Sequence, residues 1–406
     1  MIAKLRWFKF NYKFVFLLYI ALSVFATSQA FIQGQEINEV NGRVYTHYNN
    51  YVIFKQSFYH LIGNQDLYRE YPAEQWDLYK YSPAFSLFFG AMAVLPDFPG
   101  LLLWNLVNAL ILFFAVCYIP LISEKNKLLI LLAVLVELLT SLQNEQSNGL
   151  MAGLIILGFA LLERNKFFWA TFCLIFSIYI KIFGLVAFAL YLLYPHKWQL
   201  AGYTLLWSGI LLLLPLLVVS AEQLMFLYQS WRNMLAQDHS VSYGISVMGW
   251  LKTWFNLEPP KTAVLLTGAV LFCVPLLRFR QYKDYYFRLL ILSSVLIWVL
   301  IFNHKAESPT FIIAMCGVAI WYLPQERKPL NSLLFVLAIV FTSLAPTDIF
   351  PKFIRKNYFE PYVVKAVPCI LIWIKLSYDL IFRKYQPEQD SSSELTSIRP
   401  SAPSPA

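Results

Sequence analysis

The sequence predicts an all-α polytopic membrane protein with about twelve transmembrane helices and a long outer first loop containing juxtamembrane amphipathic helices. Three observations predict this class: 59% of the 406 residues are apolar, only 14% are charged, and the mean hydropathy is +0.56. A soluble domain carries roughly 25% charged residues, so an ordinary soluble enzyme is excluded. Apolar runs recur almost from end to end, which indicates that lipid is the main solvent of the chain.

Apolar stretches bounded by charged residues or proline mark the expected helices. Several are shorter than the roughly 20 residues that a helix needs to cross a bilayer, and residues 167–194 form either two helices or one broken helix. The predicted spans are 12–31, 99–122, 128–142, 149–162, 167–180, 183–194, 199–220, 262–277, 286–302, 309–323, 330–346 and 362–382. We expect one domain over residues 1–382 and a disordered cytoplasmic tail over 383–406, which is rich in Ser and Pro.

Lysine and arginine in the short connections orient these spans. The first span is too long for the core of a cleaved signal peptide, so a retained helix is favoured. If the short apolar segment 82–95 does not cross, every short basic connection falls on one side, which the positive-inside rule makes cytoplasmic together with both termini. The formal net charge of +9 then reflects topology in large part, and no nucleic-acid partner is expected.

Polar residues concentrate on the opposite, outer side. Residues 50–62 space Tyr51, Phe54, Phe58 and Leu61 by three and four positions, which predicts an amphipathic helix on the outer membrane surface. Alternatively, this loop has a structural role only and covers the end of the helix bundle. The run Gln143–Gly149 holds six polar residues in succession, and because buried amides need partners, it indicates a wet cavity more than a helix end.

Isolated charges on this side are the candidates for chemistry. Lys181 is the most isolated cation of the apolar region, and it snorkels to the surface, pairs with another side chain or binds an anion. Residues 303–309 add a histidine, a lysine and a glutamate at one helix junction, and residues 221–247 add a similar set. The sequence has no GxGxxG, P-loop, HExxH, GxSxG or CxxC motif, and no histidine and carboxylate spacing argues for a metal.

Together these residues resemble the polyprenol-phosphate-mannose-dependent mannosyltransferase-like family, glycosyltransferase family 87, which has the C-type membrane glycosyltransferase fold. The matching elements are Asn50-Tyr51-Val52-Ile53-Phe54, Gln65-Asp66-Leu67-Tyr68, Tyr79-Lys80-Tyr81-Ser82-Pro83, Gln146-Ser147-Asn148-Gly149, Lys181, His239-Ser240 and Asn303-His304. The resemblance implies transfer of a sugar from a polyprenyl-phosphate donor to a lipid or glycan acceptor on the outer face of a bacterial inner membrane. Neither a metal nor another cofactor needs to be invoked.

The resemblance also implies a site, with one departure. Asn50 stands where the family has its general-base Asp, and an amide cannot accept the acceptor's proton. Glu39 is the first candidate to replace that base, followed by Glu36, Asp66 and Glu307. The residues expected to bind the donor phosphate are Lys181, Lys305, His304, Arg232 and Lys80. The expected cavity lining is Gln143, Asn144, Gln146, Asn148, His239 and Tyr81.

Two other functions remain open at this point. A lipid-linked sugar flippase or transporter would place polar residues at mid-membrane and on both faces, and many secondary transporters show paired repeats. The sequence shows neither pattern, which argues against transport. A catalytically silent relative of the family is the other possibility, and Asn50 is its best support.

Overall fold

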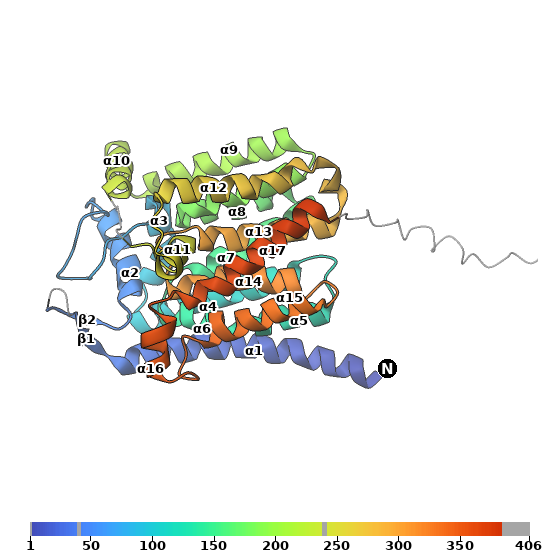
Figure 1. Cartoon of the computed structure of the whole chain (residues 1–406). Helices are drawn as coiled ribbons and strands as arrows, with labels where there is room; N and C mark the ends of the chain where they lie inside the picture. Colours follow the sequence, from blue (N-terminus) through green and yellow to red (C-terminus); the bar gives the residue numbers. More distant parts are fainter. Residues whose placement is uncertain (1, 39–41, 238–241, 384–406) are drawn as a thin grey trace, which may run out of the picture.

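The computed structural model describes residues 2–38, 42–237 and 242–383, which are mostly helical (Figure 1). The predicted all-α class is confirmed. The short strands β1 (Gln35–Ile37) and β2 (Val44–Thr46) pair antiparallel in the first loop, with Glu36 opposite Tyr45. Residues 384–406 lie outside the described part of the chain, so the disorder expected there stays a prediction.

The first half of the chain forms a run of helices joined by short connections, apart from the long first loop. Its elements are α1 (Ile2–Gln33), α2 (Asn49–Ile62), α3 (Pro83–Ala93), α4 (Asp97–Tyr118), α5 (Glu124–Ala133), α6 (Leu135–Gln143), α7 (Asn148–Glu163), α8 (Phe167–Ile180) and the 3₁₀ segment η1 (Ile182–Leu193).

The second half continues with helices that often end in a 3₁₀ or π-helical turn. Its elements are α9 (Lys197–Leu213), η2 (Leu214–Leu217), α10 (Ala221–Gln237), α11 (Val247–Phe255), α12 (Lys261–Cys273), η3 (Val274–Leu277), η4 (Phe279–Lys283), α13 (Tyr285–Ile301), η5 (Ser308–Thr310), α14 (Phe311–Tyr322), α15 (Pro329–Leu337), η6 (Ala338–Leu344), α16 (Lys352–Ile354), η7 (Arg355–Phe359), η8 (Val364–Ala366) and α17 (Val367–Phe382).

A helix occupies each of the predicted apolar stretches. Among the described residues, three helices are long and apolar enough to cross a membrane: Tyr12–Gln33, Asp97–Tyr118 and Lys197–Leu217. Helices α5 and α6, which bend by 44° where they meet, make a fourth if they form one span. The remaining apolar helices have 10–17 residues, fewer than a straight crossing needs. The apolar helices are those of a membrane protein, and the number of twelve spans stays a prediction.

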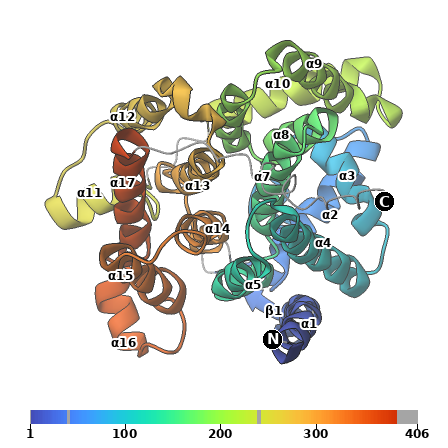
Figure 2. The ribbon, with the colours of Figure 1, turned by 90° about the vertical axis from the view of Figure 1, so that its right-hand side faces the viewer.

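Helices α7, α13 and α14 form the centre of the bundle (Figure 2). Their residues are apolar on all sides and almost all buried, as expected for helices that other helices enclose. Gly153 of α7 lets it approach α4 closely, since a Cβ at Gly153 would lie 2.9 Å from the backbone nitrogen of Leu112. Small residues allow such contacts between membrane helices.

The bundle has two ends that differ in chemistry. At the terminal end, where α1 begins and α17 finishes (Figure 1), the Arg164 guanidinium donates to the Tyr118 carbonyl and the Arg278 guanidinium donates to the Leu380 carbonyl. At the loop end lie α2, α10, α11 and the two strands (Figure 1). These basic connections therefore share the terminal end, and the assignment of that end to the cytoplasm stays a prediction.

Residues 167–194 form two separate elements rather than one broken helix. The chain turns at Lys181, whose backbone is extended between α8 and η1. Segment η1 then runs back to the terminal end, where the Tyr194 hydroxyl donates to Glu163 over 2.5 Å. Lys181 therefore lies at the loop end, in the turn between these two helical segments.

The predicted helix near residues 50–62 is present as α2, but its apolar face is covered by protein. Tyr51, Phe54 and Leu61 are fully buried, and the Tyr51 hydroxyl donates to the Met92 carbonyl just inside the end of α3. The spacing predicts the face correctly, and its assignment to the lipid surface is wrong because α3 and α4 pack against this face.

A buried ion pair fastens the loop end of the bundle. The Lys365 ammonium of η8 lies 2.9 Å from a Glu137 carboxylate oxygen of α6 and donates to the Ser308 hydroxyl of η5. Removing one partner leaves an uncompensated buried charge, which costs about 3–5 kcal/mol. We expect Lys365→Met to lower the unfolding temperature in detergent strongly, and the double variant Lys365→Met/Glu137→Leu to recover most of the loss. A single variant as stable as the wild type would contradict this role.

Candidate active site

A pocket of about 460 Å³, the loop-end pocket, lies between α2, the segment before α3, the α6–α7 connection, the Lys181 turn, α10 and the loop before η5. It brings together eight of the predicted site residues: Asn50, Lys80, Tyr81, Asn144, Gln146, Lys181, Lys305 and Glu307. Its other lining residues are Ile53, Phe54, Trp76, Asp77, Leu78, Ile182, Phe183, Leu235, Asn303 and Thr310. Three lysines and two carboxylates thus meet around one pocket.

A chain of hydrogen bonds connects a cation of this pocket to a carboxylate. The Lys181 ammonium donates to Asn148 Oδ1 over 2.8 Å, and Asn148 Nδ2 donates to Gln146 Oε1 over 2.7 Å. Gln146 Nε2 in turn donates to Glu307 Oε2 over 3.0 Å. The Asn148 and Gln146 amides are thus hydrogen-bonded to each other, and they hold Lys181 and Glu307 at the two ends of this series of hydrogen bonds.

The α6–α7 connection is held rigidly enough to position these amides. Glu145 has a positive φ of 47°, and the Trp104 indole donates to its carbonyl over 2.7 Å. The Glu145 side chain points into the protein, where burial raises the pKa of its carboxyl well above the ordinary value. The buried Glu145 side chain is therefore part of the scaffold, while its neighbours Asn144 and Gln146 line the pocket.

Lys181 is partly exposed through the pocket and otherwise closely surrounded. Its ammonium lies 5.8 Å from the ring centres of both Tyr81 and Phe183. Desolvation by this surrounding protein lowers the pKa of Lys181 to about 8, against an opposing effect of the Glu307 charge, and Lys80 lowers it further. An anion in the pocket would restore the preference for the charged ammonium.

Glu307 is fixed by the turn that it caps. It is the N-cap of η5 and forms a capping box with Thr310. The Thr310 hydroxyl donates to the Glu307 carbonyl over 2.6 Å and accepts from the Glu307 amide over 3.0 Å. The Glu307 side chain is exposed at the pocket, so its carboxylate can reach a bound molecule.

The segment before α3 supplies the opposite wall. The Lys80 ammonium pairs with Asp77 over 2.9 Å, and the Tyr81 ring packs edge-on against Phe54. On α2, Asn50 Nδ2 donates to the Asn144 carbonyl over 2.9 Å. Asn50 thus ties α2 to the α6–α7 connection at the place where the resemblance implies a base.

Several predicted site residues lie elsewhere. Both oxygens of the Asp66 carboxylate accept from the Ser230 hydroxyl, at 2.8 and 2.9 Å, so Asp66 joins the first loop to α10. Gln143 points away and donates to Gln29 of α1 over 2.6 Å. Arg232 and His304 are not among the residues that line the pocket. Glu39 and His239 fall outside the described residues. Asn148 does not itself line the pocket, but it is hydrogen-bonded to the lining residues Lys181 and Gln146.

Two of the candidate bases, Glu36 and Glu307, lie in different parts of the loop end. A Glu36 carboxylate oxygen of β1 lies 3.6 Å from His47 Nδ1, just after β2, whereas Glu307 lines the pocket. Asp77, Trp76 and Leu235 also line the pocket, and none of them was among the site residues predicted from the sequence. The signal for Asp77 was its place three residues before Lys80, because that spacing allows the ion pair that the structure shows.

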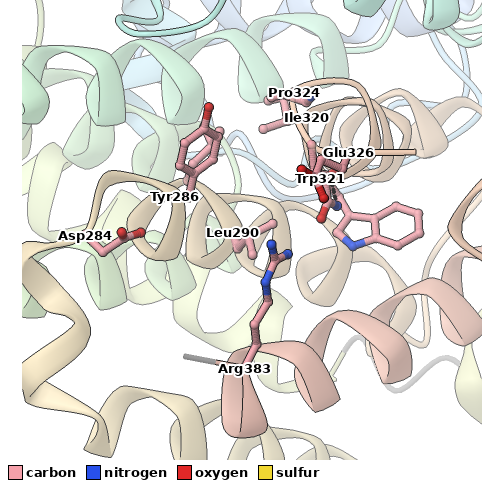
Figure 3. Close-up of a pocket in the computed structure, with 10 residues that line it drawn as sticks. Asp284, Tyr286, Leu290, Ile320, Trp321, Pro324, Glu326 and Arg383 are labelled. Carbon is pink, nitrogen blue, oxygen red and sulfur yellow. Dashed lines mark hydrogen bonds between the residues drawn. The ribbon is translucent and has the colours of Figure 1, made fainter. Parts of the chain in front are cut away.

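A different pocket of about 390 Å³ lies between α13, α14 and the end of α17 (Figure 3). Asp284 and Arg383 border it, and the Arg383 side chain extends toward Leu290 and Trp321 (Figure 3). Asp284 is engaged in capping α13 through the Phe287 amide. None of the residues predicted for the site lines this pocket, which leaves the loop-end pocket as the candidate active site.

Comparison with known proteins identifies the family of this chain. No curated protein matches the chain. The family model described as glycosyltransferase family 87 matches residues 79–302, which is more than half of the 406 residues. The match includes Lys80, Tyr81, Gln146 and Lys181, and it ends just before the Glu307 segment. The chain therefore belongs to glycosyltransferase family 87.

Proposed function

We propose that this membrane glycosyltransferase moves a sugar from a polyprenyl-phosphate donor to a lipid or glycan acceptor at the loop-end pocket, on the outer face of a bacterial inner membrane. The observation that carries the proposal is the meeting of three lysines and Glu307 in one pocket between apolar helices. A donor of this class has a hydrocarbon chain that stays in lipid and a phosphate that needs cations at the surface. The group proposed to be transferred is a hexosyl group, and the resemblance described above indicates mannose.

Lys181 is the proposed first contact of the donor phosphate. Its hydrogen bond to Asn148 fixes the ammonium, and the lowered pKa reflects an environment poor in water. Lys305 lines the same pocket, and Lys80 does so beside Asp77. Charge-assisted hydrogen bonds from such groups to phosphate are about twice as strong as neutral ones. They would also stabilise the lipid phosphate as it leaves.

Glu307 is the proposed general base in place of the family's first-loop Asp. Its carboxylate takes the proton of the acceptor hydroxyl, the acceptor oxygen forms a bond to the anomeric carbon, and the bond from that carbon to the phosphate oxygen breaks. The products are the glycosylated acceptor and the polyprenyl phosphate, with inversion at the anomeric carbon. Asp77 also lines the pocket, but its Oδ2 accepts from the charged Lys80 ammonium over 2.9 Å, whereas Glu307 Oε2 accepts from the neutral Gln146 amide.

Reconstituted protein tests the donor class. Purified full-length protein in nanodiscs is supplied with radiolabelled polyprenyl-phosphate mannose or with GDP-mannose, together with membrane lipid extract as acceptor. We expect label to move from the lipid-linked donor to a new product, and no transfer from the nucleotide sugar. Transfer from GDP-mannose alone would refute the proposed donor. Movement of intact donor across vesicles without a covalent product would support a flippase instead.

The pKa of Lys181 gives the reaction a pH dependence. The ammonium loses its proton as the pH rises through about 8, and the neutral amine attracts phosphate less. We therefore expect kcat/KM for the donor to fall above this pH, because kcat/KM reports groups of the free enzyme. Lys181→Arg keeps its charge throughout, so this fall should disappear from its profile. An identical fall in both proteins would assign the titration to another group.

A further inference from the structure

A second large cavity, of about 940 Å³, lies at the terminal end of the bundle, opposite the loop-end pocket. We call it the terminal-end cavity. The end of η1 and the start of α9 form one wall through Leu192 and Lys197, and the end of α12 with η3 and η4 forms another through Leu277 and Lys283. Arg288 of α13 lies between these walls. Nothing in the proposed transfer reaction uses this cavity.

The charge of the terminal-end cavity is positive. Three basic side chains line it, Lys197, Lys283 and Arg288, against the single carboxylate of Glu163 among its lining residues. The Arg288 guanidinium holds that carboxylate in a bidentate pair at 2.6 and 2.8 Å. The negative charge is thus already compensated, and the two lysines remain as the excess.

Lys197 is oriented by the end of η1. Its ammonium donates to the carbonyls of Tyr191 and Leu192, both at 2.7 Å. An ammonium has three N–H donors, so the third can serve a bound molecule. Lys283 is exposed at the other wall. Donors from two walls can therefore converge on one anionic group.

The rest of the cavity is apolar and continues onto apolar helix surfaces. Leu192, Leu277 and Phe279 line it with exposures of 48%, 68% and 67%, so apolar side chains are open to lipid chains along its walls. A free phosphate ion would use the lysines and leave these walls uncovered. A molecule with an anionic head and hydrocarbon chains matches both parts.

We propose that the terminal-end cavity binds an anionic phospholipid, with its phosphate between Lys197 and Lys283 and its acyl chains along Leu192 and Leu277. Basic pockets between membrane helices at the cytoplasmic side bind such headgroups. The lipid would join α9 to α12 and η3. Only 17% of the apolar window of α9 is buried in protein, so a lipid bridge would contribute much of its anchoring.

Native mass spectrometry of the full chain tests this site. The protein is mixed with phosphatidylglycerol or with phosphatidylcholine of the same acyl chains, and Lys197→Gln/Lys283→Gln is compared with the control Lys352→Gln/Lys356→Gln, whose lysines lie on α16 and η7. We expect the wild type and the control to retain phosphatidylglycerol roughly tenfold better than phosphatidylcholine. The double variant should retain both lipids equally.

Three results would overturn the proposal: equal retention of both lipids by the wild type, unchanged preference in the double variant, or competition by soluble glycerol phosphate at the same concentration as the lipid. The exposed single variant Lys283→Gln provides the comparison if Lys197→Gln prevents folding. With it, the rise in unfolding temperature caused by phosphatidylglycerol should shrink, and an unchanged rise would refute the site. These outcomes do not depend on whether sugar transfer occurs.

Discussion

Replacing Glu307 by Gln is expected to slow sugar transfer by about 10²–10⁴-fold, the usual contribution of a general base. The amide keeps the size of the side chain but cannot take the acceptor's proton. Gln146 and the capping box with Thr310 hold this position in the native protein, so the variant should fold normally. The measurement is the transfer rate at saturating donor in nanodiscs, with the unfolding temperature as a check on folding.

Matched variants separate Glu307 from the other carboxylates. Asp66→Asn removes a carboxylate that bonds Ser230 outside the pocket, and it should leave more than a tenth of the rate. Asp77→Asn loosens Lys80 and should act mainly on the donor KM. If Asp77→Asn abolishes transfer while Glu307→Gln does not, Asp77 is the base and the assignment of Glu307 is wrong.

Replacing Lys181 by Met is expected to weaken donor use by about 30-fold or more. Loss of one partner of a buried charged contact costs about 2–5 kcal/mol, and a factor of ten corresponds to about 1.4 kcal/mol. The effect should appear in kcat/KM for the donor, with little change in the KM for the acceptor. Lys181→Arg restores the charge, so it should recover part of the activity.

A matched control keeps this result specific. Lys55 lies on α2, where it pairs with Asp97 over 2.6 Å, and it does not line the loop-end pocket. Lys55→Met should therefore cost stability without changing the donor KM selectively. Equal changes in the donor KM for Lys55→Met and Lys181→Met would mean that general loss of positive charge, and not a phosphate contact, explains both.

Much of the fold could be predicted because its signal is local. Apolar runs predict helices wherever lipid or other helices surround them, and every predicted stretch is helical. The α2 helix shows the limit of this reasoning, since spacings of three and four define a face without saying what covers it. Here the cover is α3 and α4, which a one-dimensional pattern cannot distinguish from lipid.

The site was predictable where polar residues interrupt apolar sequence. Gln146, Asn148 and Lys181 stand out in the sequence for this reason, and the structure joins them by hydrogen bonds. The choice among carboxylates was not predictable, because Gln146 and Glu307 are 161 positions apart in the chain. Asp66 illustrates the same limit, since its partner Ser230 lies 164 positions away.

The central claim is that the loop-end pocket binds the donor phosphate through Lys181. Electron cryo-microscopy of the full-length protein in nanodiscs with polyprenyl phosphate tests it most directly. We expect phosphate density within hydrogen-bonding distance of the Lys181 ammonium and hydrocarbon density leading from there into the bilayer. Phosphate density at another place, such as the terminal-end cavity, with the loop-end pocket holding none would contradict the claim.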